Sequence, residues 1–417
     1  MKLIKMEDRE AERVLARLER RSAQNTGRAM PTVARIVDGV RRQGDRALRR
    51  YAAQLDGLGS RQPLRVSRDE MEEAWRATPA PLRSAMRTAA KNIRGFARRQ
   101  LPKEWNVTAG GLTTGQRVRP LDAVGCYVPG GRYPLPSTML MTVIPAQAAG
   151  VERIVVVSPR PARETLAAAA LLGVEHFYRV GGAQAIAALA YGTASIPRVD
   201  KIAGPGNWYV TAAKKLVAFD CAIDMLAGPT EIVVASQTGD PAGIAADLVA
   251  QAEHDPAALA ILVTTNVALA RAVAAEVRER VKSNAIARAA IAGNGYIFLA
   301  RSIEEVHAIA NRLAPEHLTV DSMRDLAWVR NAASVFAGPT SAQPMGDYVS
   351  GPNHTLPTGG AARARGGLSV LDFVKIVTIQ QYTPAGLARL GPAAIAMARA
   401  EGLLGHAEAV RARGIDA

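Results

Sequence analysis

A repeated order of apolar strand, glycine-containing turn and helix is the feature that most restricts how this chain can fold. Short runs rich in apolar and β-branched residues lie at 154–157, 176–180, 201–203, 231–235 and 260–264, and a helical pattern follows each of them. Runs of this kind suit strands that are buried on both faces of a parallel sheet. The alternation therefore predicts an α/β fold with two Rossmann-like, doubly wound domains.

Both ends of the chain instead carry apolar side chains mainly at helical spacing. We expect a discontinuous first α/β domain, in which residues 1–125 with their helical N-terminal part join residues 230–369. Residues 126–229 should form a second α/β domain. The helical C-terminal segment at 370–417 is too short to bury a core by itself, so it should pack on another domain or another subunit.

The composition limits the classes of protein to which the chain can belong. The sequence has no run of about 18 apolar residues, the length that a membrane span needs, and its charged N-terminal stretch lacks the apolar region of a signal peptide. Its two cysteines, Cys126 and Cys221, are too few for a disulfide framework or a cysteine-based zinc site. We therefore expect a cytoplasmic protein without a membrane partner.

The net charge of +15, from 52 basic and 37 acidic residues, leaves a second class of function open. A basic protein can bind the phosphates of nucleic acid. However, the basic residues are spread along helices, and no helix-turn-helix, zinc-finger or RNA-binding motif accompanies them. We interpret the charge as solvated basic surface and expect no nucleic-acid partner. A nucleic-acid-binding protein that has kept an enzyme fold is the alternative.

The first candidate for chemistry is the pair Gln251 and His254 at the predicted end of a helix. Residues three apart lie on one helix face, and zinc accepts nitrogen and oxygen ligands. A histidine at a helix end is also a common partner of the helix dipole or a surface residue. The pair alone leaves a metal site and a structural role both open.

Two further polar segments carry histidines, of which the chain has only six. Glu316 and His317 follow a proline in a predicted turn or extended segment, and the two side chains could serve as separate proton-transfer groups. Asp347 and His354 lie in a turn-rich segment, and loops of α/β proteins often carry function. The alternative is that these side chains are simply exposed, because the sequence does not show that the segments converge.

Three glycine turns between a strand and a helix are candidate nucleotide contacts, at 127–131, 181–184 and 204–207. Backbone N–H groups at the start of a helix suit phosphates. None of the turns contains G-x-G-x-x-G, so the usual dinucleotide fingerprint is absent. Each turn could be only a tight connection, but three in succession favour nucleotide binding.

Four blocks of sequence, in the right order, resemble the histidinol dehydrogenase family, and the resemblance covers nearly the whole chain. The blocks lie at 223–236, 251–254, 314–318 and 346–358. The resemblance implies an enzyme that oxidises L-histidinol through L-histidinaldehyde to L-histidine, the last reaction of histidine biosynthesis, with two NAD and one zinc ion. It also implies a homodimer in which the C-terminal segment of each subunit completes the active site of the other.

The resemblance assigns roles to individual residues. It implies that His317 is the general base and that Glu316 activates the water that adds to the aldehyde. The zinc ligands would be Gln251, His254, Asp347 and, from the other subunit, His406. The substrate contacts would be Thr230, Gln251, His254, His317, Asp347, His354, Glu401 and His406. The NAD contacts would be Tyr127, Gln184 and Asn207, which lie in the three glycine turns, so the second α/β domain is expected to bind NAD.

Two positions depart from the pattern of the family. Thr230 stands where many members have Ser, which keeps the hydroxyl group. Gln343 stands where many have Glu, which removes a charge close to the substrate. The alternative function is therefore a paralogous zinc- and NAD-dependent dehydrogenase of another small amino alcohol or a polyol, including sulfonated ones. The intact block at 346–358 and Glu401 favour histidinol.

Overall fold

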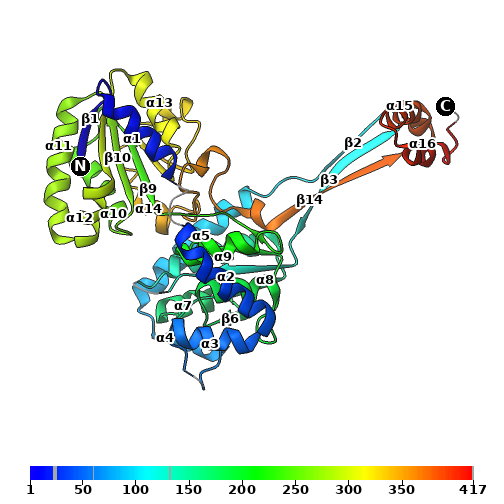
Figure 1. Cartoon of the computed structure of the whole chain (residues 1–417), viewed down its shortest axis with the longest axis horizontal. Helices are drawn as coiled ribbons and strands as arrows, with labels where there is room; N and C mark the ends of the chain where they lie inside the picture. The colour runs from blue at the N-terminus through cyan, green and yellow to red at the C-terminus, as the bar shows by residue number, and fades with distance from the viewer. Residues whose placement is uncertain (22–25, 60, 131–132, 416–417) are drawn as a thin grey trace. The chain divides into compact units, whose positions relative to one another are not determined.

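The structure, a computed structural model, describes residues 1–21, 26–59, 61–130 and 133–415. These residues form two compact units. The larger unit comprises residues 1–100 and 121–373 and contains two parallel sheets, whereas residues 101–120 and 374–417 form a smaller unit around an antiparallel sheet (Figure 1). The chain is thus an α/β protein, as the alternation of strands and helices predicted.

A six-stranded parallel sheet organises one half of the larger unit. In spatial order, its strands are β1 (Lys2–Lys5), β11 (Gly295–Leu299), β10 (Leu259–Thr264), β9 (Glu231–Ala235), β12 (His317–Val320) and β13 (Ser334–Ala337). One face is covered by α10 (Pro241–Ala252), α11 (Val267–Arg280) and α12 (Ala285–Asn294), and the other by α1 (Arg9–Glu19) and α13 (Ile303–Leu313). Because successive side chains of a strand point to opposite faces, β9 supplies Ile232 and Val234 to one core and Val233 and Ala235 to the other.

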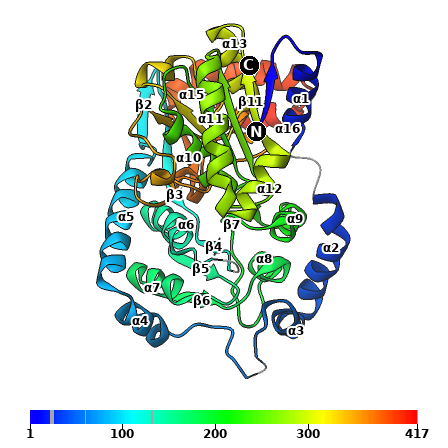
Figure 2. The same ribbon diagram turned by 90° about the vertical axis from the view of Figure 1, so that its left-hand side faces the viewer.

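A five-stranded parallel sheet organises the other half. Its strands, in spatial order, are β6 (His176–Tyr178), β5 (Arg153–Val157), β4 (Ala123–Tyr127), β7 (Lys201–Ala203) and β8 (Ala222–Ile223). One face packs against α2 (Thr26–Gln43), α3 (Asp45–Asp56), α8 (Gly182–Tyr191) and α9 (Trp208–Val217). The other packs against α4 (Arg68–Ala77), α5 (Ala80–Arg99), α6 (Pro136–Ala149) and α7 (Arg163–Leu172), so this sheet lies between two helical layers (Figure 2).

The local sequence explains where these elements begin and end. Asp240 caps α10 by accepting a 2.8 Å hydrogen bond from the Gly243 N–H, and a proline occupies the first position of that helix. Gly150 closes α6 with a φ of 86°, a left-handed conformation that glycine adopts without strain. All five strands predicted from apolar runs are confirmed, with boundaries within two residues.

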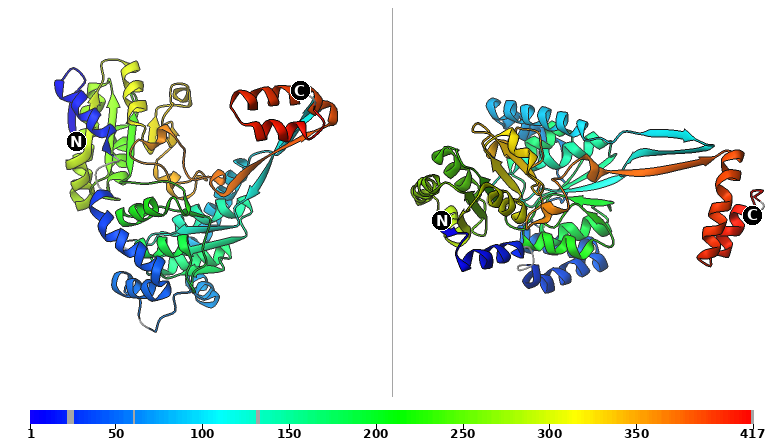
Figure 3. Two further views of the ribbon diagram at one scale, coloured as in Figure 1. Left: turned by 45° about the vertical axis from the view of Figure 1, so that its right-hand side comes forward. Right: turned by 90° about the horizontal axis from the view of Figure 1, so that it is seen from above.

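The smaller unit is a three-stranded antiparallel ribbon that ends in two helices (Figure 3). Its strands are β2 (Trp105–Ala109), β3 (Leu112–Pro120) and β14 (Val374–Tyr382), and its helices are α15 (Pro384–Ala400) and α16 (Leu404–Arg411). β14 pairs with β3 along its whole length, from Val374 opposite Pro120 to Tyr382 opposite Leu112. The two helices share only a small core, made by Ile395, Ala398, Ala407 and Ile415.

Three features differ from the sequence predictions. Residues 374–382, expected to be helical, form β14, because a run rich in valine, isoleucine and threonine favours a strand. Residues 2–5, also expected in a helical segment, form an edge strand too short to give a periodic signal. The helices between 26 and 99, expected with the first domain, pack on the five-stranded sheet. An amphipathic helix shows that it has an apolar face but not which sheet that face will cover. In the described ranges, no helix is long and apolar enough to cross a bilayer.

Candidate active site

The starts of two neighbouring strands bring the first group of predicted site residues together. β9 and β12 run parallel, with His317 in register with Ile232. Thr230 directly precedes β9, and Glu316 directly precedes β12. Ala314, with a left-handed φ of 45°, ends α13 and turns the chain toward the sheet. Residues from two separate sequence blocks therefore meet at one edge of the six-stranded sheet.

Glu316 is a buried carboxyl group with two defined donors. Its Oε2 atom accepts a 2.5 Å hydrogen bond from the Thr230 hydroxyl and a 2.8 Å hydrogen bond from the Glu231 N–H. Burial is the main cause that raises the pKa of Glu316 well above the usual range, and the charges of Glu231 and Asp347 raise it further. The carboxylate is therefore a stronger base than an ordinary glutamate, which suits proton abstraction from a weak acid such as water.

His317 is buried in one defined tautomer. Its Nδ1 atom lies 3.1 Å from the carbonyl oxygen of Glu231, and a carbonyl oxygen can only accept, so Nδ1 carries the proton. Nε2 keeps its lone pair and lies 3.9 Å from Oδ1 of Asp347. Burial, the main cause, lowers the pKa of His317. The ring is therefore neutral near pH 7, with Nε2 ready to accept a proton.

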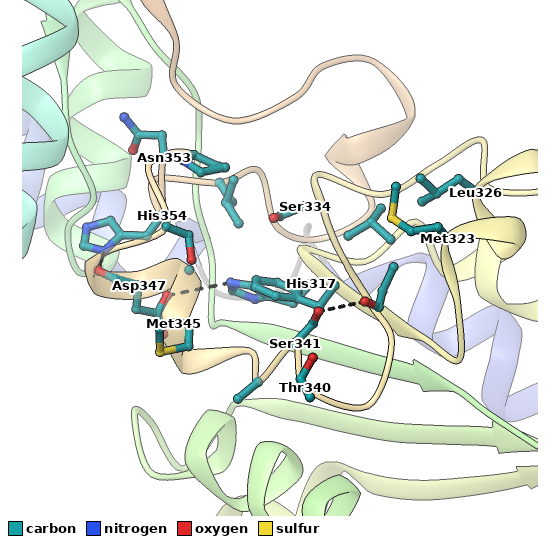
Figure 4. Close-up of a pocket in the computed structure, with 18 residues that line it drawn as sticks. His317, Met323, Leu326, Ser334, Thr340, Ser341, Met345, Asp347, Asn353 and His354 are labelled. Atoms are coloured by element: carbon teal, nitrogen blue, oxygen red, sulfur yellow. Dashed lines mark hydrogen bonds and ion pairs between the residues drawn. The ribbon is translucent and has the colours of Figure 1, made fainter. Parts of the chain in front are cut away.

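A pocket of about 570 Å³ lies against His317, Asp347 and His354 (Figure 4). Asp347 belongs to the short helix α14 (Pro344–Tyr348), and its Oδ2 atom accepts a 3.1 Å hydrogen bond from Nε2 of the buried Gln343. His354 places Nδ1 2.9 Å from the carbonyl oxygen of Asp347 and Nε2 3.2 Å from the Thr138 hydroxyl. The pocket thus combines one carboxylate and two imidazoles whose orientations are fixed by hydrogen bonds.

Gln251 joins the site through Thr230. Its Nε2 atom donates to the Thr230 hydroxyl, whereas its buried Oε1 atom has no hydrogen-bond partner among the described residues. His254 follows the end of α10 and is exposed, and its electrostatic effect adds to burial, the main cause, in lowering the pKa of His317 and of His354. No three His, Cys, Asp or Glu side chains of the described ranges form a metal-binding group by themselves. An unpartnered amide oxygen is nevertheless a feature that a cation would satisfy.

The other two predicted site residues lie in the smaller unit. Glu401 and His406 are exposed, and both line a cavity of about 690 Å³ formed by α15, α16 and the turn between them. Met397 and Leu403 contribute apolar surface to the same cavity. The structure therefore brings these two residues together within their own unit.

The predicted NAD contacts lie at the carboxyl edge of the five-stranded sheet. Tyr127 ends β4, Gln184 lies in the first turn of α8, and Asn207 caps α9 through hydrogen bonds from the N–H groups of Tyr209 and Val210. The chain builds β5 and β6 on one side of β4 and β7 and β8 on the other. The strand order therefore reverses between β4 and β7, and open α/β sheets commonly bind ligands beside the carboxyl ends of the strands at such a reversal. Of the three glycine turns, part of the first lies outside the described residues, because the description stops at Gly130 and resumes at Tyr133.

A buried carboxylate organises the second turn. Asp56 accepts 3.0 Å hydrogen bonds from the Gly181 N–H and from Nε2 of Gln184. The Tyr127 hydroxyl accepts a 3.1 Å hydrogen bond from the Gly182 N–H. The Oε1 atom of Gln184 is buried and has no hydrogen-bond partner among the described residues. This turn therefore presents one free acceptor on a rigidly held side chain.

Comparison with known proteins identifies the family to which this chain is related. The family model for histidinol dehydrogenase matches residues 19–414. The chain is 46% identical over 431 aligned positions to the histidinol dehydrogenase of Methanopyrus kandleri, with 99% of each chain covered. It is 48% identical over 391 positions to that of Geobacillus kaustophilus, with 91% of this chain and 92% of the relative covered. The crystal structure of histidinol dehydrogenase from Elizabethkingia anophelis superposes with a TM-score of 0.93 at 35% identity, covering 99% of this chain and 98% of that one.

This chain belongs to the histidinol dehydrogenase family. The family assignment predicted from the four sequence blocks is confirmed, and so is the class of protein, an NAD-dependent oxidoreductase of histidine biosynthesis. The fold is the histidinol dehydrogenase fold.

Sequence reasoning missed three residues that support the site: Asp56, Thr138 and Glu231. The sequence carries a signal for one of them, because Glu231 is a charged residue at the start of an otherwise apolar strand. A charge at such a position needs a partner within the fold. Thr138 carries no such signal, since a threonine in the first turn of a helix is common, and Asp56, the last residue of α3, does not show in the sequence which groups it would bind.

Proposed function

We propose that this chain oxidises L-histidinol through L-histidinaldehyde to L-histidine, with transfer of two hydrides to NAD. One observation carries the proposal: a neutral imidazole, His317, and a strongly basic buried carboxyl group, Glu316, are held by the two peptide groups of a single residue. Oxidation of an alcohol to an acid removes a proton from the substrate hydroxyl group and another from the water that adds to the aldehyde, and two proton acceptors in one site can divide these steps. The adjacent pocket also suits a small polar substrate.

His317 is the base for the alcohol oxidations. Its Nε2 atom takes the substrate hydroxyl proton as hydride leaves the same carbon. The carbonyl of Glu231 accepts from Nδ1–H and stabilises the imidazolium that forms. Asp347, with Oδ1 3.9 Å from Nε2, adds a negative charge that favours this proton uptake.

Glu316 acts between the two oxidations. As a carboxylate, it takes a proton from the water whose oxygen adds to the aldehyde carbon, while the protonated His317 returns its proton to the aldehyde oxygen. The product is the gem-diol, and the neutral His317 can then accept a hydroxyl proton as the second hydride leaves. The hydroxyl of Thr230 and the N–H of Glu231 fix its orientation. The burial of both proton acceptors also limits the access of bulk water to the reactive aldehyde.

The donor set of the site fits a zinc ion. Gln251 offers a buried amide oxygen without a partner, and His254 and Asp347 add an imidazole and a carboxylate, which are ligand types that zinc accepts. We infer that these three residues and His406 of a second copy hold the metal. When bound, zinc supplies a positive charge that orients the substrate, and NAD supplies the hydride acceptor.

We infer that NAD binds the domain formed around residues 126–229, beside the carboxyl ends of β4 and β7. Tyr127 ends β4, Asn207 caps the helix that follows β7, and Gln184 carries a buried Oε1 atom without a partner among the described residues. The strand order and the helices on both faces support a Rossmann-like, doubly wound character for both parallel sheets.

We also infer a homodimer with shared active sites. The smaller unit exposes Met397 and Leu404 to 62% and 69%, respectively, beside the cavity that Glu401 and His406 line. Apolar surface next to candidate substrate and metal contacts supports the placement of this unit over the active site of a second copy. The two cysteines are buried and unpaired, which fits a reducing, cytoplasmic compartment.

The second candidate is oxidation of another small amino alcohol or a polyol, and it is favoured by the neutral Gln343. Its amide donates to Asp347, so a family glutamate at this position would put a second negative charge beside Asp347. Steady-state rates of NADH formation at 340 nm for L-histidinol, other amino alcohols and polyols separate the candidates. We expect kcat/KM to be highest for L-histidinol. A higher kcat/KM for another alcohol would replace the proposed substrate.

A further inference from the structure

Glu231 is a buried carboxylate at the start of β9, and its side chain is only 3% exposed. The four residues that follow it in the strand are apolar and buried. A charged group in such a place destabilises the fold unless opposite charge and hydrogen bonds compensate it. Its partners therefore show what the position is used for.

Arg21, just after α1, provides that compensation through two parallel bonds. Its Nε and Nη2 atoms lie 2.5 and 2.6 Å from Oε1 and Oε2 of Glu231. The Gly359 N–H donates a third bond, of 2.8 Å, to Oε1. Arg21 also donates to the carbonyl oxygens of Leu18 and Leu313, at 2.6 and 2.9 Å. The Arg21–Glu231 ion pair thus holds the ends of α1 and α13 through Arg21 and the loop at Gly359 through Glu231.

The backbone of the same residue holds both proton acceptors of the site. The Glu231 N–H donates to Oε2 of Glu316 over 2.8 Å, and the Glu231 carbonyl oxygen lies 3.1 Å from Nδ1 of His317. The first bond orients the carboxylate, and the second selects the tautomer that leaves Nε2 free. A rotation of the peptide planes at this residue would disturb both groups together.

We propose that the Arg21–Glu231 ion pair is a positioning device that fixes the peptide groups on which Glu316 and His317 depend. The inference rests on the proposed function, in which these two residues are the proton acceptors. Arg21 touches neither of them and acts through Glu231. The planar fork of arginine matches both carboxylate oxygens, so the pair restrains the orientation of the side chain as well as its charge.

A second ion-pair group gives a matched control. Arg312 lies 2.9 Å from Oε1 of Glu19 and 2.7 Å from Oε2 of Glu12, so it also ties α1 to α13. Within the described part of the chain, the Arg312 side chain forms no hydrogen bond or ion pair with Glu231, Glu316 or His317. Loss of Arg312 should therefore weaken the same helix contact without turning the Glu231 peptide groups.

The test compares Arg21→Met, Arg21→Lys and Arg312→Met for L-histidinol oxidation. We expect Arg21→Met to lower kcat by about 10- to 100-fold, the scale of a catalytic group displaced by a fraction of an ångström to one ångström. Arg21→Lys keeps the charge but not the fork, so its kcat should lie in between. Arg312→Met should keep kcat within about twofold while its Tm falls, because its ion pairs lie outside the site. If Arg21→Met does not fold, the double variant Arg21→Met/Glu231→Gln leaves no unpaired buried charge and takes its place.

Nitrogen-15 NMR of labelled histidine provides a readout that does not depend on turnover. In the wild type and in Arg312→Met, His317 should show a protected Nδ1 proton, which we expect to be lost or shifted in Arg21→Met. Retained kcat in Arg21→Met, an equal loss in Arg312→Met or an unchanged His317 signal would overturn the inference. If the wild type itself does not oxidise L-histidinol, the proposed function fails, whereas the NMR comparison still tests the positioning.

Discussion

Thr230→Val removes the hydroxyl group that links Gln251 to Glu316 and keeps the β-branched shape of the side chain. The hydroxyl donates to Oε2 of Glu316 over 2.5 Å and accepts from Nε2 of Gln251. An intramolecular hydrogen bond contributes about 1 kcal/mol, and a buried donor left unpaired costs about 1–3 kcal/mol. We therefore expect the free energy of unfolding to fall by about 2–4 kcal/mol.

The same variant should change the pH dependence of the reaction. The Thr230 hydrogen bond lowers the pKa of Glu316 against the larger effect of burial, which raises it. Loss of a bond of about 1 kcal/mol raises that pKa further, by somewhat less than one unit. Because Glu316 must be ionised to act as a base, the acid limb of the kcat profile should move to higher pH.

Two variants serve as controls for this prediction, measured by urea unfolding and by kcat between about pH 5 and about pH 9. Thr230→Ser keeps the hydroxyl and should keep the acid limb in place. Thr211→Val removes a 2.9 Å bond to the Ala227 carbonyl, which involves neither Gln251 nor Glu316, and should cost only about 1 kcal/mol. A Thr230→Val protein as stable as Thr211→Val, with an unmoved acid limb, would refute the reasoning.

Further predictions concern pH, NAD and the metal. Burial raises the pKa of Asp247 to about 6 from its usual 3.8. The contribution of its protonated form to the free energy of unfolding is therefore fully present below about pH 4 and is lost as the pH rises through about 6. The Tm of Asp247→Asn should therefore rise relative to the Tm of the wild type between about pH 5 and about pH 8. A difference in Tm that stays constant over this range would contradict the prediction. Gln184→Leu should raise the KM for NAD, whereas Gln147→Leu, which loses only a bond to the Leu172 carbonyl, should not; equal KM values argue against the NAD site. His254→Ala should weaken zinc binding in chelator competition by more than the roughly 10- to 100-fold that loss of a residue supporting a ligand costs, because it removes a proposed ligand itself. His307→Ala, whose ring stacks on Trp328, should leave the zinc affinity unchanged, and equal affinities in the two variants would remove His254 from the ligand set.

The sequence predicted the parallel sheets well because their strands carry a strong local signal. A run such as Glu231–Ala235 is too short for a helix and rich in β-branched residues, and glycine or proline turns mark its ends. By contrast, Val374–Tyr382 has the same β-branched character but pairs with residues 112–120, far away in the sequence. Its β-branched run is a local signal for a strand, but the helical pattern of the residues that follow it outweighed this signal, so the strand was missed.

The candidate site was likewise predicted only in part from the sequence. Because scarce histidines lie close to acidic residues in the sequence, Glu316, His317, Asp347 and His354 could be predicted as candidate site residues. The structure places these four around one sheet edge and one pocket. The tautomer of His317 could not be predicted, because it depends on a carbonyl oxygen 86 residues away. Backbone groups carry no residue-type signal, so the role of the Glu231 peptide groups emerges only from the fold.

The number of NADH molecules formed for each L-histidinol consumed tests the central claim most directly. The claim is that one site with two proton acceptors, His317 and Glu316, carries both oxidations. With limiting L-histidinol and excess NAD, the wild type should form two NADH and one L-histidine, and Glu316→Gln should slow the second oxidation more than the first. One NADH per substrate with release of the aldehyde, or two NADH at an unchanged rate in Glu316→Gln, would contradict the account.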